Sequence, residues 1–169
     1  MIKMKELIHD ENLQMMVRQK IFNDQVVWRS WQWQENKPMM LVLVKQTQFI
    51  GLLSDDETTR LVRNYVSETN QYGGLVIGYL ASAETKHLFE RQWLPELVKL
   101  TRQATRVVIG TGSWSLDKVI GKRRFQVYLK ACRQGHQSHK LTWLLDEGGR
   151  KVVPQVLEGG RWYTGPVDN

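Results

Sequence analysis

The chain has 169 residues, of which 41% are hydrophobic and 24% are charged, and its formal net charge is +7. These values are typical of one globular domain, residues 1–169, and they exclude a disordered or low-complexity chain. A single cysteine excludes an internal disulfide, and no apolar run is long enough to span a bilayer, so we expect a cytoplasmic protein without membrane association.

The N-terminal third predicts one helix and two strands. Apolar residues at helical spacing predict a helix over residues 10–22. Residues 25–34 are rich in Val and Trp, which favour a strand. A turn signal at residues 35–38 leads to an apolar strand over residues 39–45, and this short connection predicts that the two strands form an antiparallel hairpin.

Helical and apolar strand patterns alternate along the rest of the chain. Helices are predicted over residues 54–70, 83–103 (broken at Pro95) and 116–134. Strands are predicted over residues 75–81, 106–109, 141–145 and 151–157. Strand–helix alternation implies parallel crossovers. The expected fold class is therefore α/β: a mixed sheet in which an antiparallel N-terminal hairpin precedes parallel strand–helix–strand units, with helices on both faces.

A glycine-containing loop follows the strand at residues 106–109 and precedes a helix. Open α/β sheets bind ligands at this edge, and a helix start offers free N–H groups to an anion. The loop has neither a third glycine for a dinucleotide fingerprint nor a P-loop ending, and its alternative interpretation is an ordinary turn with Ser115 capping the helix. The candidate phosphate or anion site consists of Gly110, Thr111, Gly112, Ser113, Ser115 and Lys118.

The helix predicted over residues 116–134 has a basic side. Residues 105–145 contain eight Lys or Arg and one acid, Asp117. A basic helix face can follow a phosphate backbone without reading its sequence; the alternative is a solvated face with no such partner. Arg124 is expected to broaden this surface. The candidate nucleic-acid contacts are Lys122, Arg123, Lys130, Arg133 and Lys140.

Other residues give weaker signals. On a strand, Trp31 and Trp33 face one side and Trp28 the other, which fits either a core or an interface. His136 and His139 lack a third metal ligand, so no metal site is predicted. Cys132 lies on the apolar face of its helix and is expected to be buried.

The sequence alone does not decide the function or whether the chain is an enzyme, and it indicates no cofactor. Because no nucleophile–base pair or metal set can be assembled, the favoured hypothesis is a small non-catalytic binding or regulatory module for an anionic ligand or a protein partner. One alternative is an enzyme or sensor that binds a phosphorylated small molecule at residues 110–118. Another is sequence-nonspecific nucleic-acid binding through the helix face at residues 116–140. The oligomeric state is left open.

Overall fold

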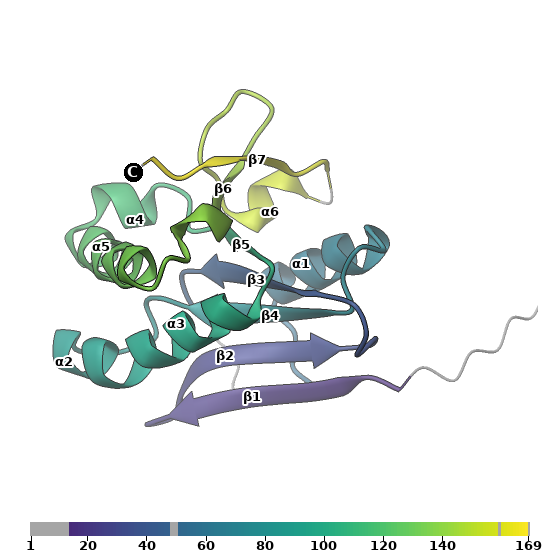
Figure 1. The fold of residues 1–169 in the computed structure, drawn as a ribbon, viewed down its shortest axis with the longest axis horizontal. Coiled ribbons are helices and arrows are strands. Elements are labelled where there is room, and N and C mark those ends of the chain that lie inside the picture. Colours follow the sequence, from purple (N-terminus) through teal and green to yellow (C-terminus); the bar gives the residue numbers. More distant parts are fainter. Residues whose placement is uncertain (1–13, 48–50, 159, 169) are drawn as a thin grey trace, which may run out of the picture.

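The computed structural model describes residues 14–47, 51–158 and 160–168. Within these residues the chain forms a seven-stranded mixed sheet with the order β1-β2-β4-β3-β5-β6-β7 (Figure 1). The strands are β1 (Met16–Phe22), β2 (Gln25–Gln32), β3 (Met39–Val44), β4 (Gly74–Tyr79), β5 (Arg106–Ile109), β6 (Leu141–Leu145) and β7 (Tyr163–Pro166). The helices are α1 (Glu57–Glu68), α2 (Lys86–Leu88), the π-helical turn η1 (Phe89–Trp93), α3 (Leu94–Gln103), α4 (Trp114–Asp117), α5 (Val119–Gln134), the 3-10 turn η2 (Ser138–Lys140) and α6 (Pro154–Leu157).

The N-terminal segment forms a strand where the sequence predicts a helix over residues 10–22. Residues 10–13 lie outside the described residues, and Met16–Phe22 is β1, antiparallel to β2. The turn between the two strands consists of Asn23 and Asp24, whose φ angles are 48° and 59°. Positive φ at both positions is typical of the type I′ hairpin turn, which favours Asn and Asp. Pairing with β2 therefore overrides the helical spacing of the apolar residues.

The prediction that the strands at residues 25–34 and 39–45 pair as an antiparallel hairpin is wrong, because these two strands do not pair with each other. β4 lies between β2 and β3, antiparallel to the first and parallel to the second. The connection from β2 to β3 passes the start of β4. There the backbone N–H groups of Trp33 and Gln34 both donate to the carbonyl of Gly73. The predicted fold class is confirmed, because β1 and β2 form an antiparallel hairpin and β4, β3, β5 and β6 are parallel.

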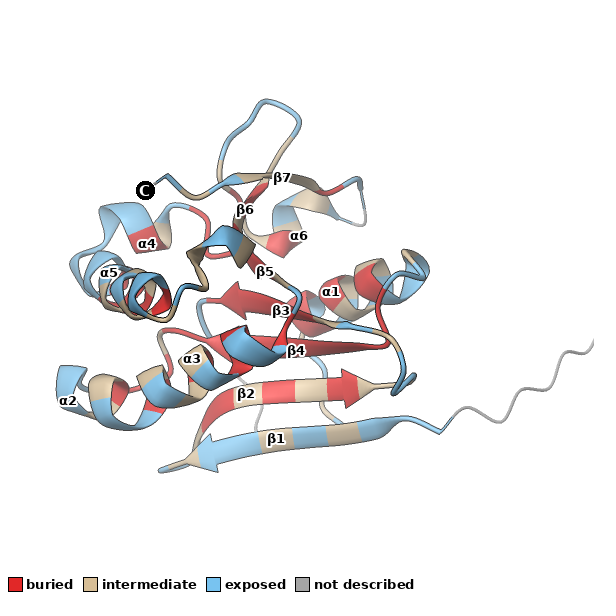
Figure 2. Cartoon of the chain, viewed as in Figure 1, coloured by how far each residue is buried: buried red, intermediate tan, exposed pale blue. Residues whose placement is uncertain are grey.

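Helices cover both faces of the sheet. α3 and α5 pack on one face and α1 packs on the other. β3 and β4 lie between these layers and are buried along almost their whole length, whereas β1 is largely exposed (Figure 2). α3 contributes Leu97 and Leu100 to its side of the core, and α1 contributes Val62 and Val66 to the other. The sheet therefore separates two hydrophobic core clusters.

Two elements near the middle and end of the chain differ from their predicted form. The helix predicted over residues 83–103 is divided into α2, η1 and α3, and Pro95 lies in the first turn of α3, directly after the π-helical turn η1. The strand predicted over residues 151–157 is wrong: Lys151 makes an isolated bridge to Leu145, and the chain then forms α6. β7 is the strand that pairs with β6 at this edge.

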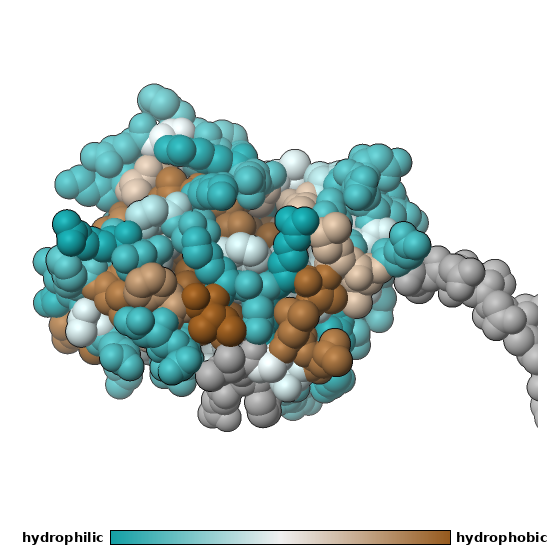
Figure 3. Space-filling view, turned by 90° about the horizontal axis from the view of Figure 1, so that it is seen from below, coloured by the Kyte–Doolittle hydropathy of each residue, from teal (hydrophilic) through white to brown (hydrophobic). Residues whose placement is uncertain are grey.

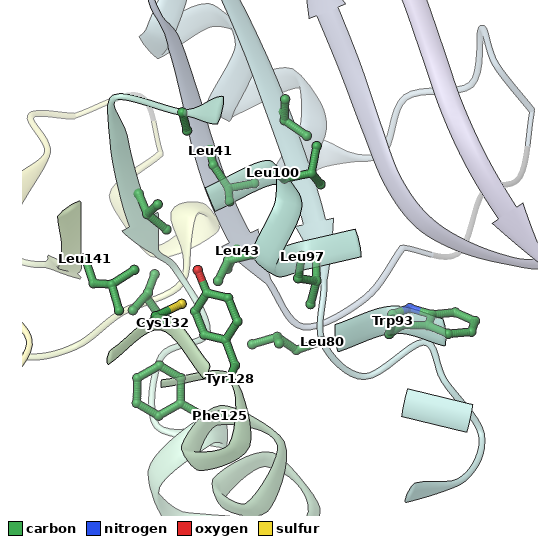
Figure 4. Close-up of a cluster of buried hydrophobic side chains, with 14 of the residues drawn as sticks. Leu41, Leu43, Leu80, Trp93, Leu97, Leu100, Phe125, Tyr128, Cys132 and Leu141 are labelled. Atoms are coloured by element: carbon green, nitrogen blue, oxygen red, sulfur yellow. The ribbon is translucent and has the colours of Figure 1, made fainter. Parts of the chain in front are cut away.

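The core beneath α5 contains a buried hydrogen bond. The hydroxyl oxygens of Tyr128 and Thr101 are 2.6 Å apart, and the Thr101 hydroxyl donates to the carbonyl of Leu97. Figure 4 shows the Tyr128 ring between Phe125, Cys132 and the leucines of this cluster. Burial raises the pKa of the Tyr128 phenol well above its ordinary value. The neutral phenol is therefore the form that joins α5 to α3.

Replacing Tyr128 by Phe tests this contact. We expect the Tyr128→Phe variant to lose about 1 kcal/mol of unfolding free energy, since one buried hydrogen bond is removed while Thr101 keeps Leu97 as its acceptor. The matched control is Tyr65→Phe, which keeps the ring stacked on Trp162 at 4.0 Å and is expected to change stability by less than about 0.5 kcal/mol. Urea denaturation measures both; equal losses would contradict the assignment.

Candidate functional site

The glycine-containing loop lies at a topological switch point of the sheet. The chain leaves β3 through α1 toward β4 on one side, and it leaves β5 through α4 and α5 toward β6 on the other. In open α/β sheets, the crevice between two such strand ends is the usual ligand position. Gly110 directly follows β5, and its N–H donates to the carbonyl of Leu43 in β3 at 2.7 Å. The structure therefore places this loop at the position that the sequence analysis expects.

Other parts of the chain cover the loop's glycines. A Cβ atom added to Gly110 would lie 3.2 Å from Cδ of Pro154, and one added to Gly112 would lie 3.2 Å from Cγ1 of Val153. Gly112 also has a φ of 58°, which favours glycine. The backbone of Gly110, Thr111 and Gly112 is therefore packed beneath the segment that starts α6, and a ligand reaching it would have to displace Val153 and Pro154.

The polar side chains of this loop are divided between core and surface. Thr111 and Ser115 are each 1% exposed, and their hydroxyl oxygens are 2.7 Å apart. Ser115 therefore pairs with Thr111 instead of capping a helix. Ser113 and Lys118 are exposed. Phosphate binding at this loop stays a prediction, and these two side chains are the ones that a ligand in solution can reach.

The candidate nucleic-acid residues of α5 lie together on its solvent side. Lys122, Arg123, Lys130 and Arg133 are all exposed, and we call them the α5 basic face. The sequence of α5 contains no Asp or Glu. Within the described residues, none of the four forms a side-chain ion pair, and the Arg133 guanidinium donates only to the backbone carbonyl of Asp168 at 3.2 Å. None of the four is therefore held in an ion pair with a described residue, although Glu84 and Glu90 line the same pocket as Arg123.

Two basic residues expected on this surface have structural contacts instead. Arg124 is 6% exposed; its guanidinium donates to the carbonyl of Leu80 at 2.9 Å and to that of Ala83, and lies over the Phe89 ring. The expectation that Arg124 broadens the basic surface is wrong. Lys140 donates to the carbonyls of Thr101 and Arg102 at 3.2 and 3.1 Å, which satisfies the C-terminal end of α3. The structure thus brings Lys140 to α3 and not into the α5 basic face.

Comparison with models of protein families, with curated proteins and with solved structures finds no match. The geometry of the described residues is therefore the basis for a functional proposal. The elements on the α3 and α5 side, residues 86–103 and 119–134, contain nine Lys or Arg and two Glu. α1 on the opposite side contains two Arg and two Glu. Among these helices, the excess of positive charge therefore lies on the α3 and α5 side.

The three N-terminal tryptophans occupy both faces of β2 and its end, as predicted. Trp31 is 2% exposed and packs with Trp33 on the α1 side, whereas Trp28 packs on the α3 side. Trp31 is therefore a core residue. The half-buried Trp28 donates from its indole N–H to Oε2 of Glu96 at 3.1 Å, and Trp33 donates to the carbonyl of Tyr72.

Sequence reasoning missed the buried Arg29 between these tryptophans. Arg29 is 1% exposed, and its guanidinium donates to the carbonyls of Ser54 at 2.7 Å and Gly51 at 3.0 Å. It thereby attaches the loop before α1 to β2. The available sequence signal was a charged residue at a strand position that faces the core. Because a buried charge needs hydrogen-bond partners, such a position indicates that Arg29 binds a neighbouring segment.

Metal ligands, membrane spans and Cys132 are the remaining features of the described residues. They contain no group of three or more His, Cys, Asp or Glu side chains that could hold a metal ion. None of the helices in the described part of the chain is long and apolar enough to cross a bilayer. Cys132 is buried, and burial raises the pKa of its thiol, which disfavours the reactive thiolate.

Proposed function

We propose that this chain is a binding module for a polyanion, and that its ligand is the phosphate backbone of a nucleic acid held on the α5 basic face. The observation that carries the proposal is the row of four exposed cations, none in an ion pair with a described residue, on a helix without acids. Exposed Lys and Arg bind phosphates by releasing condensed counterions, whatever the base sequence. This proposal supplies one concrete ligand for the anion-binding module expected from sequence.

The dimensions of α5 suit this ligand. The eleven-residue step from Lys122 to Arg133 rises by about 16 Å along the helix axis. One strand of a duplex advances by about 3.4 Å per phosphate along the duplex axis, so a helix of this length lying along that axis spans about five phosphates. The concentration of positive charge on the α3 and α5 side would also steer a polyanion toward this helix and away from α1.

Salt dependence tests the proposal directly. We expect a fluorescent duplex oligonucleotide to bind with a slope of log K against log salt between about −3 and −4, because each of four phosphate contacts contributes about −0.9. Affinity should change little when the base sequence is scrambled. Fluorescence anisotropy at several salt concentrations measures both quantities. Absence of binding at low salt, or a slope near zero, would contradict the proposal.

An acidic protein surface is a second candidate ligand for the same region. Val119 and Ile120 are 73% and 58% exposed at the start of α5, and Leu116 of α4 is 37% exposed. Apolar side chains beside Lys118 and Lys122 resemble the anchors of a protein interface more than phosphate contacts. Val119→Ser/Ile120→Ser separates the candidates: nucleic-acid affinity should stay within about twofold if the backbone is held by charge alone. A large loss of nucleic-acid affinity would show that binding also needs the exposed apolar side chains of Val119 and Ile120.

A further inference from the structure

A groove runs beside α3 where the sheet is left uncovered. β2 and β1 extend beyond α3, and a groove of about 220 Å³ lies between them and that helix. We call it the β2–α3 groove; the lining residues used below are Arg18, Trp28, Ser30, Gln32, Lys99 and Gln103. Figure 3, which looks onto the β1 edge, shows mainly hydrophilic side chains with separate hydrophobic groups between them. The surroundings of the groove are therefore mixed and not continuously apolar.

The floor and one wall of the groove offer unused hydrogen-bonding groups. Ser30 and Gln32 alternate with buried residues on β2 and so share the α3 side with Trp28. The side chains of Ser30, Gln32 and Gln103 make no hydrogen bond to any described residue. A side-chain amide presents both donors and an acceptor, which matches the edge of a nucleobase. These groups can therefore recognise a planar heterocycle.

Trp28 supplies a fixed aromatic wall. Its indole N–H is 3.1 Å from Oε2 of Glu96, and Nζ of Lys20 is 2.7 Å from Oε1 of the same carboxyl group. Partial burial raises the pKa of the Glu96 carboxyl, but the hydrogen bonds from Lys20 and Trp28 outweigh it and lower the pKa below its ordinary value. The Glu96 carboxylate is thus ionised, and each of its two oxygens already accepts a hydrogen bond. An aromatic side chain held in this way is suited to contact a base.

The charge at the rim is positive. Arg18 of β1 and Lys99 of α3 are exposed, line the groove and form no ion pair among the described residues. Glu96 contributes a carboxylate to the lining, but Lys20 pairs with it. A ligand with an aromatic ring and a phosphate group therefore meets a complementary partner for each part. The volume is below the range of roughly 300–1,000 Å³ that holds drug-sized ligands, so one ring fits better than a large cofactor.

We propose that the β2–α3 groove binds one unpaired nucleotide of a single-stranded nucleic acid. The base contacts Trp28 and the amide groups of Gln32 and Gln103, and the phosphate contacts Arg18 and Lys99. This proposal rests on the function proposed above, because the α5 basic face then holds the backbone of the same strand. α3 separates the two surfaces and packs against α5 through Thr101 and Tyr128, and Arg102 is exposed on α3 between them. Bases paired in a duplex are not free to enter the groove.

The experiment compares single-stranded and duplex oligonucleotides of the same sequence by fluorescence anisotropy. The test variant Lys99→Ala/Gln103→Ala changes two exposed positions of α3, where Ala is compatible with a helix. The matched control Arg91→Ala/Gln92→Ala removes one cation and one amide from exposed positions of η1. We expect the test variant to lose about tenfold in single-strand affinity and less than about twofold in duplex affinity. The control should change neither by more than about twofold.

Trp28→Phe provides a second variant that keeps an aromatic ring but removes the hydrogen bond to Glu96. Its single-strand affinity should also fall while duplex affinity is retained. A test variant that behaves like the control, or that loses single-strand and duplex affinity by the same factor, would overturn the groove proposal and leave α5 binding intact. If the unmodified chain binds neither oligonucleotide, the proposed function itself fails.

Discussion

A Lys122→Glu/Lys130→Glu variant is expected to bind nucleic acid about fiftyfold more weakly than the unmodified chain at about 0.1 M salt. Both lysines are exposed on α5, and no acidic residue of that helix offsets them. Removing two phosphate contacts should make the slope of log K against log salt shallower by about two, and the loss should be the same for every base sequence. Fluorescence anisotropy across a salt series measures the affinity and the slope together.

The control for this variant changes the net charge by the same amount elsewhere. Arg60 on α1 and Arg161 beside Trp162 are exposed, and Trp162 stacks on Tyr65 of α1. Arg60→Glu/Arg161→Glu should reduce affinity by less than about threefold, because these charges lie away from the α5 basic face and act only through screened long-range attraction. Equal losses in the two variants would mean that binding depends on net charge and has no defined surface.

The largest stability effect is expected from Arg124, and its neighbour Arg123 provides the comparison. Arg124→Met should lower the unfolding free energy by about 3 kcal/mol, because the buried carbonyl groups of Leu80 and Ala83 lose their donor at a cost of about 1–3 kcal/mol each. Met keeps the apolar stem that packs beside Phe89. Chemical denaturation followed by tryptophan fluorescence measures the difference.

Arg123→Met removes the same charge one residue away, from an exposed position whose side chain makes no hydrogen bond or ion pair to a described residue. Its unfolding free energy should change by less than about 0.5 kcal/mol. Nucleic-acid binding should respond in the opposite order: Arg123→Met weakens it, whereas folded Arg124→Met protein retains it. Similar stabilities for the two variants would show that the contacts of Arg124 do not hold α5 against the loop after β4.

The parallel part of the fold was predictable because its signals are local. β4 and β5 are apolar runs without alternation, as expected for strands covered on both faces, and α5 has a clear apolar stripe. The N-terminal part was not, because Val17 and Ile21 fit a helical period as well as they fit one face of a strand. The Asn23–Asp24 pair was the available hairpin signal. The insertion of β4 between β2 and β3 depends on non-local pairing that no short sequence window contains.

Within the candidate site, the sequence predicts exposure only for side chains that lie opposite the apolar stripe of a helix. Lys122 and Lys130 project away from the apolar stripe of α5, so their exposure could be read from spacing. Arg124 is four residues before Tyr128, which places both on one side of the helix, and this signal was missed when Arg124 was assigned to the basic surface. By contrast, the packing of Val153 and Pro154 over the glycine loop, and the groove beside Trp28, follow from long-range arrangement and have no local signal.

Mapping the bound surface by nuclear magnetic resonance is the most direct test of binding on the α5 basic face. In a titration with a duplex oligonucleotide, backbone amide signals of residues 118–133 should show the largest shift changes, and those of α1 should stay in place. A charged ligand perturbs the amides nearest to it, so this pattern would locate the backbone on α5. Shift changes concentrated on α1, or on residues 110–115 with α5 unaffected, would contradict the account.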